Sequence, residues 1–353
     1  MSHFTVLVKI DAEAIAKHGS AEKAVDVMLR PYQENNMDNC PSEFLKFTDK
    51  TDEIDDDWKN KMIDCYRLAN GKLVFSWDNR FKQPVIEDDG TTHSWKTKSV
   101  CPDNAEKVNI HLNEMYESFE LYVEEWQGYS RCGSNNEYGY WENPNATWDW
   151  FQIGGRWTGY FPVKNNAGYI GEGSLVCKPL EDATNLADIC QISDLDIEKI
   201  QANSQDEIDK FCEYWKKYDY GRNPEMDWHA KSYCRSFALK YDLLDCKDKG
   251  DITGEVFLTI PWDKEKTPER FDVWKCPVSE NDIRTKYSDF FAPLRTYAVL
   301  DNDGWHAASD MGWWGMSLNT SAEQTQEYNE NWFDKFIESE PDSTWLAIVD
   351  CHI

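Results

Sequence analysis

The two ends of the chain alternate apolar and polar positions with the two-residue period of a β-strand. Residues 4–10 (FTVLVKI) and residues 344–353 (TWLAIVDCHI) each place every second side chain on one apolar face. Matched alternation is expected of strands that share one buried layer. We therefore predict that these two segments are antiparallel neighbours in one sheet, although they lie at opposite ends of the sequence.

Helical periodicity and turn residues divide the remaining chain. Residues 12–29 are predicted to be helical, with a break at Gly19 and with Ser20 capping the second half. Residues 108–123 also have helical spacing. Residues 302–304 (Asn-Asp-Gly) predict a hairpin turn, and residues 321–338 predict a helix that begins after Ser321.

This order of elements indicates an α+β fold. The specific prediction is a ferredoxin-like βαββαβ arrangement, with a mainly antiparallel sheet and helices on one face. Residues 1–180 and 250–353 are expected to form one α+β domain that contains the paired terminal strands. Residues 181–249 have helical spacing and are predicted to be a helical insertion or subdomain.

The charge of the chain restricts its partners. The 353 residues include 41% hydrophobic residues and 17 Trp, which predicts a folded core, but 65 acidic and 37 basic residues give a net charge of -28. Direct binding of nucleic acid or of an anionic membrane is not expected, because both need a basic surface. The acidity either provides solubility or forms a face that meets a basic partner or mimics DNA.

The cysteines and the first residues suggest a cytoplasmic protein. There are 11 cysteines, an odd number, without a C-x-x-C pair or zinc-finger spacing. The sequence starts MSHFTVLVKI, without a secretion leader, and no apolar run approaches the ~18 residues of a membrane span. We expect free thiols in a reducing compartment. No P-loop, nucleophile elbow, zinc-protease or dinucleotide-binding motif is present, so no cofactor is expected.

Residues 143–161 (NPNATWDWFQIGGRWTGYF) form the densest aromatic segment, and the glycine pair within it permits a positive φ or a close backbone approach. One interpretation is a bulged strand with Trp148, Trp150 and Trp157 buried and the arginine paired to an acid. The other is a site in which the arginine, beside indoles and backbone amides, binds a carboxylate, a phosphate or a flat base. The candidate ligand-binding residues are Trp150, Gly154, Gly155, Arg156 and Trp157.

A second candidate site follows from the predicted pairing of the terminal strands. His3, Asp350 and His352 all lie on the faces opposite the apolar sets, and antiparallel pairing would bring the two histidines together. Two histidines and a carboxylate can ligate a metal or transfer protons. The alternative is a pair of half-exposed histidines at the margin of a sheet.

Several motifs taken together resemble a family of uncharacterised proteins from bacteriophages and bacterial mobile elements. They are MSHFTVLV, RPYQENNMDNCPSEFLKF, NPNATWDWFQIGGRWTG, MGWWG and the terminal VDCHI, and they span most of the chain. The segment WDWFQIGGRW is also similar to the W-D-W…G-T-K-W element of YubB-like proteins, which have a ferredoxin-like domain. Gly155 and Arg156 stand where that element has Thr-Lys.

The resemblance, the acidity and the missing catalytic motifs favour a non-enzymatic accessory protein. It would act in the host cytoplasm by binding a host protein, for example as an inhibitor of a defence or housekeeping system. The alternative is an enzyme or a sequestering protein for a small anionic ligand such as a nucleotide, with Arg156 in the pocket.

Overall fold

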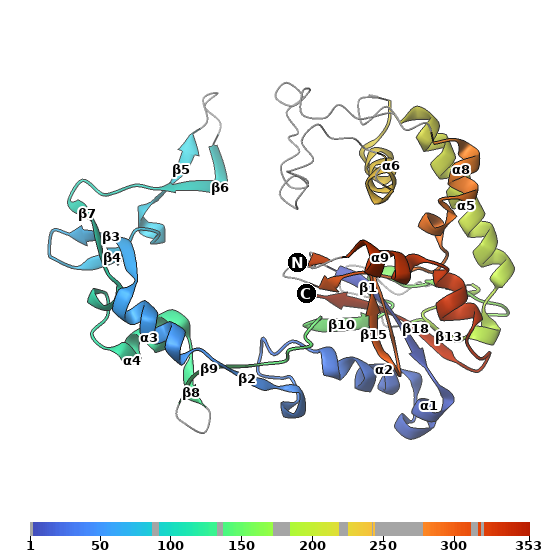
Figure 1. Cartoon of the computed structure of the whole chain (residues 1–353), viewed down its shortest axis with the longest axis horizontal. Coiled ribbons are helices and arrows are strands. Elements are labelled where there is room, and N and C mark those ends of the chain that lie inside the picture. The colour runs from blue at the N-terminus through green and yellow to red at the C-terminus, as the bar shows by residue number, and fades with distance from the viewer. Residues whose placement is uncertain are drawn as a thin grey trace. The chain divides into compact units, whose positions relative to one another are not determined.

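The chain forms two compact units. The structure is a computed structural model that describes residues 3–86, 92–132, 137–171, 184–218, 225–241, 243, 278–311, 317–318 and 321–353 (Figure 1). Unit 1 comprises residues 1–33 and 147–353, and unit 2 comprises residues 34–146. Neither expected domain boundary, at residue 180 or at residue 250, coincides with a boundary between the two units. Residue 250 belongs to the segment 244–277, which lies outside the described residues.

Unit 1 is built on one sheet whose two central strands come from the two ends of the chain. Its strands are β1 (His3–Ile10), β10 (Trp150–Ile153), β13 (Ile189–Gln191), β14 (Ala298–Asp301), β15 (Gly304–Ala307) and β18 (Trp345–His352). The order is β10-β18-β1-β14-β15, and β13 also pairs with β18. β1 and β18 are antiparallel, with His3 opposite His352 and Thr5 opposite Asp350, which confirms the predicted pairing and its register.

Helices cover both faces of this sheet, so the expectation of helices on one face was wrong. On one face, Val6 and Val8 belong to the core formed with α2 (Ala21–Leu29), which follows α1 (Ala12–His18). On the other face, Leu7 packs with residues of α9 (Ala322–Asn329) and of the π-helical turn η10 (Asp334–Glu338). The physical reason is that β18 is buried along nearly its whole length, as expected of a strand covered on both sides.

The strand order does not confirm the ferredoxin-like topology. β1 and β14 are direct neighbours and run parallel, whereas the other pairs of the sheet are antiparallel. In the split βαβ unit of a ferredoxin-like fold, another strand separates the two parallel strands. The described fold is therefore a mixed α and β structure around a mainly antiparallel sheet.

The helical part of unit 1 has its own core. It contains α5 (Ile197–Lys217), α6 (Trp228–Lys240) and α8 (Glu280–Thr285), which bury Phe211 and Phe237. Short strands complete the unit: β11 (Phe161–Pro162), β12 (Leu186–Ala187), β16 (Asp310–Met311) and β17 (Ser317–Leu318). The predicted helical block is thus only partly helical, because residues 186–187 and 189–191 form strands. Periodicity alone cannot distinguish a short buried apolar run in a strand from one in a helix.

The described residues of unit 2 form three small antiparallel sheets. Their strands are β2 (Lys46–Asp49), β8 (Ser130–Cys132) and β9 (Glu137–Glu142); β3 (Met62–Leu68), β4 (Leu73–Phe75) and β7 (Ala105–His111); and β5 (Lys82–Ile86) with β6 (Thr92–Ser99). The helices α3 (Thr51–Asn60) and α4 (Phe119–Tyr122) bury Ile54 and Tyr122 against Ile63 and Leu112. The predicted helix at residues 108–123 is instead the end of β7 followed by short helical turns.

The two predicted helix caps and the predicted hairpin are confirmed. The amide of Lys23 donates to Ser20 Oγ at 3.3 Å, and the amide of Gln324 donates to Ser321 Oγ at 3.0 Å. β14 and β15 pair as a hairpin around residues 302–303. Free thiols are found at Cys40, Cys65, Cys101, Cys190, Cys212, Cys234 and Cys351. Among the described residues, no helix has the length and apolarity that crossing a bilayer requires.

Candidate functional site

The polar end of the sheet brings three ring side chains together across three strands. His3 of β1 lies opposite His352 of β18, and Trp150 of β10 lies opposite the same histidine on its other side. The two imidazole centroids are 5.0 Å apart at an interplanar angle of 75°. The predicted approach of the two histidines is therefore present in the structure.

Each histidine is held by its own carboxylate. His3 Nδ1 lies 2.7 Å from Asp350 Oδ1, and His352 Nδ1 lies 2.6 Å from Asp149 Oδ1. Asp350 is fully buried, and the His352 side chain is only 6% exposed. A carboxylate at Nδ1 fixes the orientation of an imidazole and favours the tautomer in which Nδ1 carries the proton.

His352 Nε2 is the most distinctive atom of this site. It is buried and has no hydrogen-bond partner in the part of the chain that the structure describes. Buried polar atoms are nearly always hydrogen-bonded, so an exception requires an explanation such as a catalytic role or an additional bound group. Because Asp149 occupies Nδ1, Nε2 is the position at which His352 can accept or donate a proton.

Trp150 stacks on a histidine ring and is nevertheless substantially exposed to solvent. Its indole stacks on the His352 ring, with centroids 5.0 Å apart and an interplanar angle of 17°, and it meets His3 edge-on at 5.2 Å. The residue is 40% exposed. The prediction that Trp150 is mostly buried was wrong, because β10 pairs only with β18 in the described sheet and thus lies at its edge.

The other two tryptophans of the aromatic segment serve the core. Trp148 is 4% exposed and donates its Nε1 hydrogen to the carbonyl oxygen of Leu29 at 3.0 Å, as the burial prediction required. Trp157 is half-buried and packs against the core beneath the second face of the sheet. Trp157 is therefore a packing residue of the loop rather than part of the histidine cluster.

The glycine pair allows two buried carboxylates to approach the backbone closely. Gly154 and Gly155 have φ values of +75° and +53°, as the sequence predicted. A Cβ atom on Gly155 would lie 2.4 Å from Asp350 Cβ, and one on Gly154 would lie 2.3 Å from Asp188 Oδ2. Neither position has room for a side chain.

Those two aspartates hold the loop that follows β10. Asp350 Oδ2 accepts a hydrogen bond from the amide of Arg156 at 2.9 Å. Asp188 is fully buried and accepts from the Thr158 hydroxyl, the Gly159 amide and the Gly171 amide at 2.9, 2.6 and 2.8 Å. Asp350 thus connects the loop directly to His3.

Arg156 has an exposed side chain. Its guanidinium makes no hydrogen bond or ion pair with any residue that the structure describes, whereas its amide is bonded to Asp350. The interpretation of Arg156 as a buried, acid-paired arginine was therefore wrong. Asp350 contacts both the backbone amide of Arg156 and the ring of His3, so it links the arginine to the histidine site. The exposed guanidinium is available to an external anion.

Most polar atoms of the predicted set His3, Asp350 and His352 already have partners. Both oxygens of Asp350 already accept hydrogen bonds or face His3, and each Nδ1 is occupied by a carboxylate. Among the described residues, no group of three or more His, Cys, Asp or Glu side chains is arranged to hold a metal ion. Sequence reasoning did not predict the contacts of Asp149 and Asp188, because these depend on the positions of β10 and β13.

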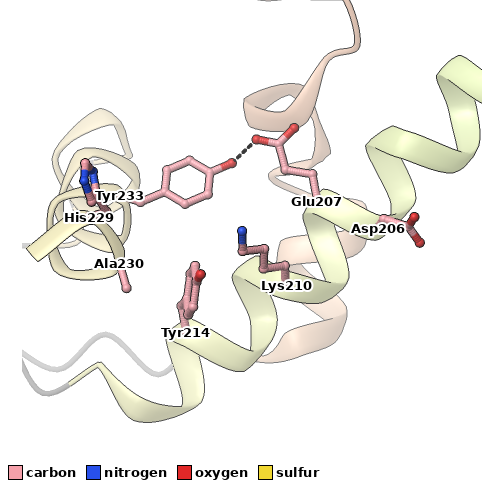
Figure 2. A pocket seen from close by; sticks show the side chains of 7 residues that line it. All are labelled: Asp206, Glu207, Lys210, Tyr214, His229, Ala230 and Tyr233. Carbon is pink, nitrogen blue, oxygen red and sulfur yellow. Dashed lines mark hydrogen bonds between the residues drawn. The ribbon is translucent and has the colours of Figure 1, made fainter. Parts of the chain in front are cut away.

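A pocket of about 530 Å³ lies between α5 and α6 (Figure 2). Its lining residues are Asp206, Glu207, Lys210, Tyr214, His229, Ala230 and Tyr233. The Tyr233 hydroxyl donates to Glu207, and burial together with that carboxylate raises the pKa of Tyr233. Its charged side chains are exposed to solvent, and none has the buried, unpartnered polar atom that marks the histidine site.

Comparison with protein-family models, curated proteins and solved structures found no match to this chain.

Proposed function

We propose that the chain acts on a small anionic ligand such as a nucleotide, and that its two histidine–aspartate pairs transfer protons to and from that ligand. One observation carries this proposal: His352 is buried, its Nδ1 is held by Asp149, and its Nε2 lacks a partner among the described residues. A second imidazole, held by a different carboxylate, lies 5.0 Å away. Two such groups supply both a base and an acid.

Hydrolysis of a phosphate ester is the reaction class that uses both groups. One imidazole would accept a proton from the attacking water, and the other would donate a proton to the leaving oxygen as the P–O bond breaks. The exposed guanidinium of Arg156 suits the phosphate oxygens. The exposed part of the Trp150 indole offers a surface on which a base can stack.

The test measures thermal stability with nucleoside monophosphates, cyclic nucleotides and inorganic phosphate. A bound ligand at 100 times its Kd should add about 2.7 kcal/mol to the free energy of unfolding. We expect this gain to disappear in His352→Asn and to persist in the control His306→Asn, whose ring bonds Asp301 near the far end of β1. Chromatography of the incubated nucleotides then separates turnover from sequestration. A panel without any stabilising ligand would contradict the proposal.

Arg156→Ala tests the role of the anion-binding group. Because the guanidinium has no partner among the described residues, we expect the free energy of unfolding to change by less than about 0.5 kcal/mol. The affinity for the phosphate-bearing ligand should fall by about tenfold, equivalent to one charge-assisted hydrogen bond. Arg67→Ala, which removes a similarly exposed guanidinium from β3, is the matched control. A loss of ~3 kcal/mol in stability for Arg156→Ala alone would mean that the arginine is structural.

Binding of a host protein by a phage accessory protein is our second candidate function. The net charge of -28 supports it, since an acidic surface suits a basic partner. A pull-down from host lysate, repeated with His352→Asn, separates the two candidates: a partner retained by that variant does not depend on the histidine site.

A further inference from the structure

Unit 2 carries a cluster of four aromatic rings, which we call the aromatic platform: Phe75, Tyr116 and Trp126, which are half-buried, and Trp77, which is exposed. Trp77 stacks on Phe75, with ring centroids 4.6 Å apart and an interplanar angle of 20°, and Trp126 lies 4.9 Å from Phe75. Trp77 is 44% exposed. The half-buried rings of Phe75 and Trp126 contact this indole, and the rest of it is accessible to solvent.

Three glutamates lie next to platform residues in the sequence. Glu117, Glu124 and Glu125 are exposed and make no ion pair with a residue that the structure describes. Glu125 is close enough that its charge adds to burial in raising the pKa of Tyr116. The surface therefore combines an exposed indole with uncompensated negative charge, which is the chemistry that attracts a cation with a planar or polarisable head group.

We propose that the aromatic platform binds an arginine- or lysine-bearing segment of a partner protein. A guanidinium would stack on the Trp77 indole while the neighbouring glutamates balance its charge. Exposed aromatic patches on folded proteins commonly mark interaction sites, and tryptophan with arginine is a frequent pair at their centres. The inference rests on unit 2 alone and does not depend on the histidine site.

The experiment uses a hexaarginine peptide as the probe and the full chain as the receptor. Binding is followed by calorimetry at about 150 mM salt, where the Debye length is ~8 Å and long-range attraction is largely screened. We expect Trp77→Ala to weaken binding by about tenfold. Trp77→Phe, which keeps an aromatic ring, should weaken binding less. Trp141→Ala is the matched control, because Trp141 is 46% exposed on the same unit but contacts Phe47 instead of the platform.

A charge-matched pair of double variants separates site binding from general attraction. Glu124→Gln with Glu125→Gln removes two charges at the platform, whereas Glu43→Gln with Asp103→Asn removes two exposed charges elsewhere on unit 2. At constant ionic strength, we expect the double variant Glu124→Gln/Glu125→Gln to weaken hexaarginine binding, and the double variant Glu43→Gln/Asp103→Asn not to do so. Equal effects of the two double variants would overturn the proposal and leave only non-specific attraction to an acidic chain. Equal affinities of Trp77→Ala and Trp141→Ala would overturn it in the same way.

Discussion

Lys9 is a buried cation near the C-terminal end of β1, whereas the histidine site lies at the N-terminal end of the same strand. Its Nζ lies 3.0 Å from Asp301 Oδ2 and 2.5 Å from Glu340 Oε1, and the residue is only 8% exposed. Asp301 Oδ1 also meets His306 Nε2 at 2.8 Å. A buried charge is tolerated when its partners are arranged around it, so the removal of one partner is more costly than the loss of a surface pair.

The pKa of Asp301 gives this cluster a defined pH dependence. Burial raises that pKa, but the hydrogen bonds from His306 and Lys9 and the charge of Lys9 outweigh it, so the pKa is lowered overall. A lowered pKa in the folded state stabilises the protein above the unfolded value of about 3.9, and this contribution is lost as the pH falls through the folded pKa.

We therefore predict that Asp301→Asn lowers the free energy of unfolding by about 2 kcal/mol at pH 7. The difference from wild type should begin to shrink below about pH 4, where the unfolded carboxyl is protonated, and should disappear once the pH falls below the lowered pKa of the folded state. Denaturant unfolding between pH 2 and 7 measures it. The control is the exposed Asp303→Asn two residues away. A difference that stays constant down to pH 2 would show that the ion pairs contribute little.

At the same residue scale, the sequence predicted both members of the His3–Asp350 pair but only the histidine of the His352–Asp149 pair. The register of two alternating strands was enough to bring His3, His352 and Asp350 together. Asp149 could not be predicted, because it precedes β10 and reaches His352 only through the pairing of β10 with β18. That pairing joins segments about two hundred residues apart, and no local pattern encodes it.

At the scale of elements, the Gly154–Gly155 turn shows how a loop is fixed to a sheet. β10 ends where the chain turns over Asp350, and the two glycines allow the backbone to approach the carboxylates of Asp188 and Asp350. The sequence predicted this break, since paired glycines within an aromatic strand pattern indicate a bulge or a close approach. It could not predict which side chains fill the space, because Asp350 comes from β18 and Asp188 from the residue that precedes β13.

Gly155→Ala should destabilise the protein more than Gly19→Ala. Both positions have positive φ, so both substitutions incur the cost of a left-handed backbone, about 1–2 kcal/mol. At Gly19 a Cβ would meet nothing within 4 Å, whereas at Gly155 it would meet Asp350 Cβ at 2.4 Å. We expect Gly155→Ala to cost at least ~2 kcal/mol more, because the clash displaces a buried carboxylate.

Chemical denaturation of the two glycine variants measures this difference directly. The chemical shifts of the His3 imidazole, recorded in parallel, should change in Gly155→Ala only, since Asp350 holds that ring. Equal losses of stability in the two variants would show that backbone strain alone explains the glycines, without a role for the close approach.

At the scale of the whole molecule, the chain is one unit interrupted by another. The alternating terminal strands revealed the sheet of unit 1, but unit 2 was not predicted, because its strands are short and polar side chains occupy much of their length. The ends of the insertion are fixed within unit 1: the amide of Thr147 donates to the carbonyl oxygen of Tyr32 at 2.8 Å, and Gln33 forms a bridge with Trp148. The two points where unit 2 leaves and rejoins unit 1 are therefore adjacent.

This adjacency predicts that residues 34–146 can be replaced by a short Gly-Ser linker without loss of the sheet. The closing ends already lie within hydrogen-bond distance, so the linker spans almost no distance and its closure entropy is small. The shortened chain should unfold cooperatively and keep the ligand response that depends on His352. It should lose the tight, Trp77-dependent binding of hexaarginine, because the whole aromatic platform lies in unit 2. Calorimetric unfolding with each probe tests both statements, and the opposite pattern would mean that the two sites have been assigned to the wrong units.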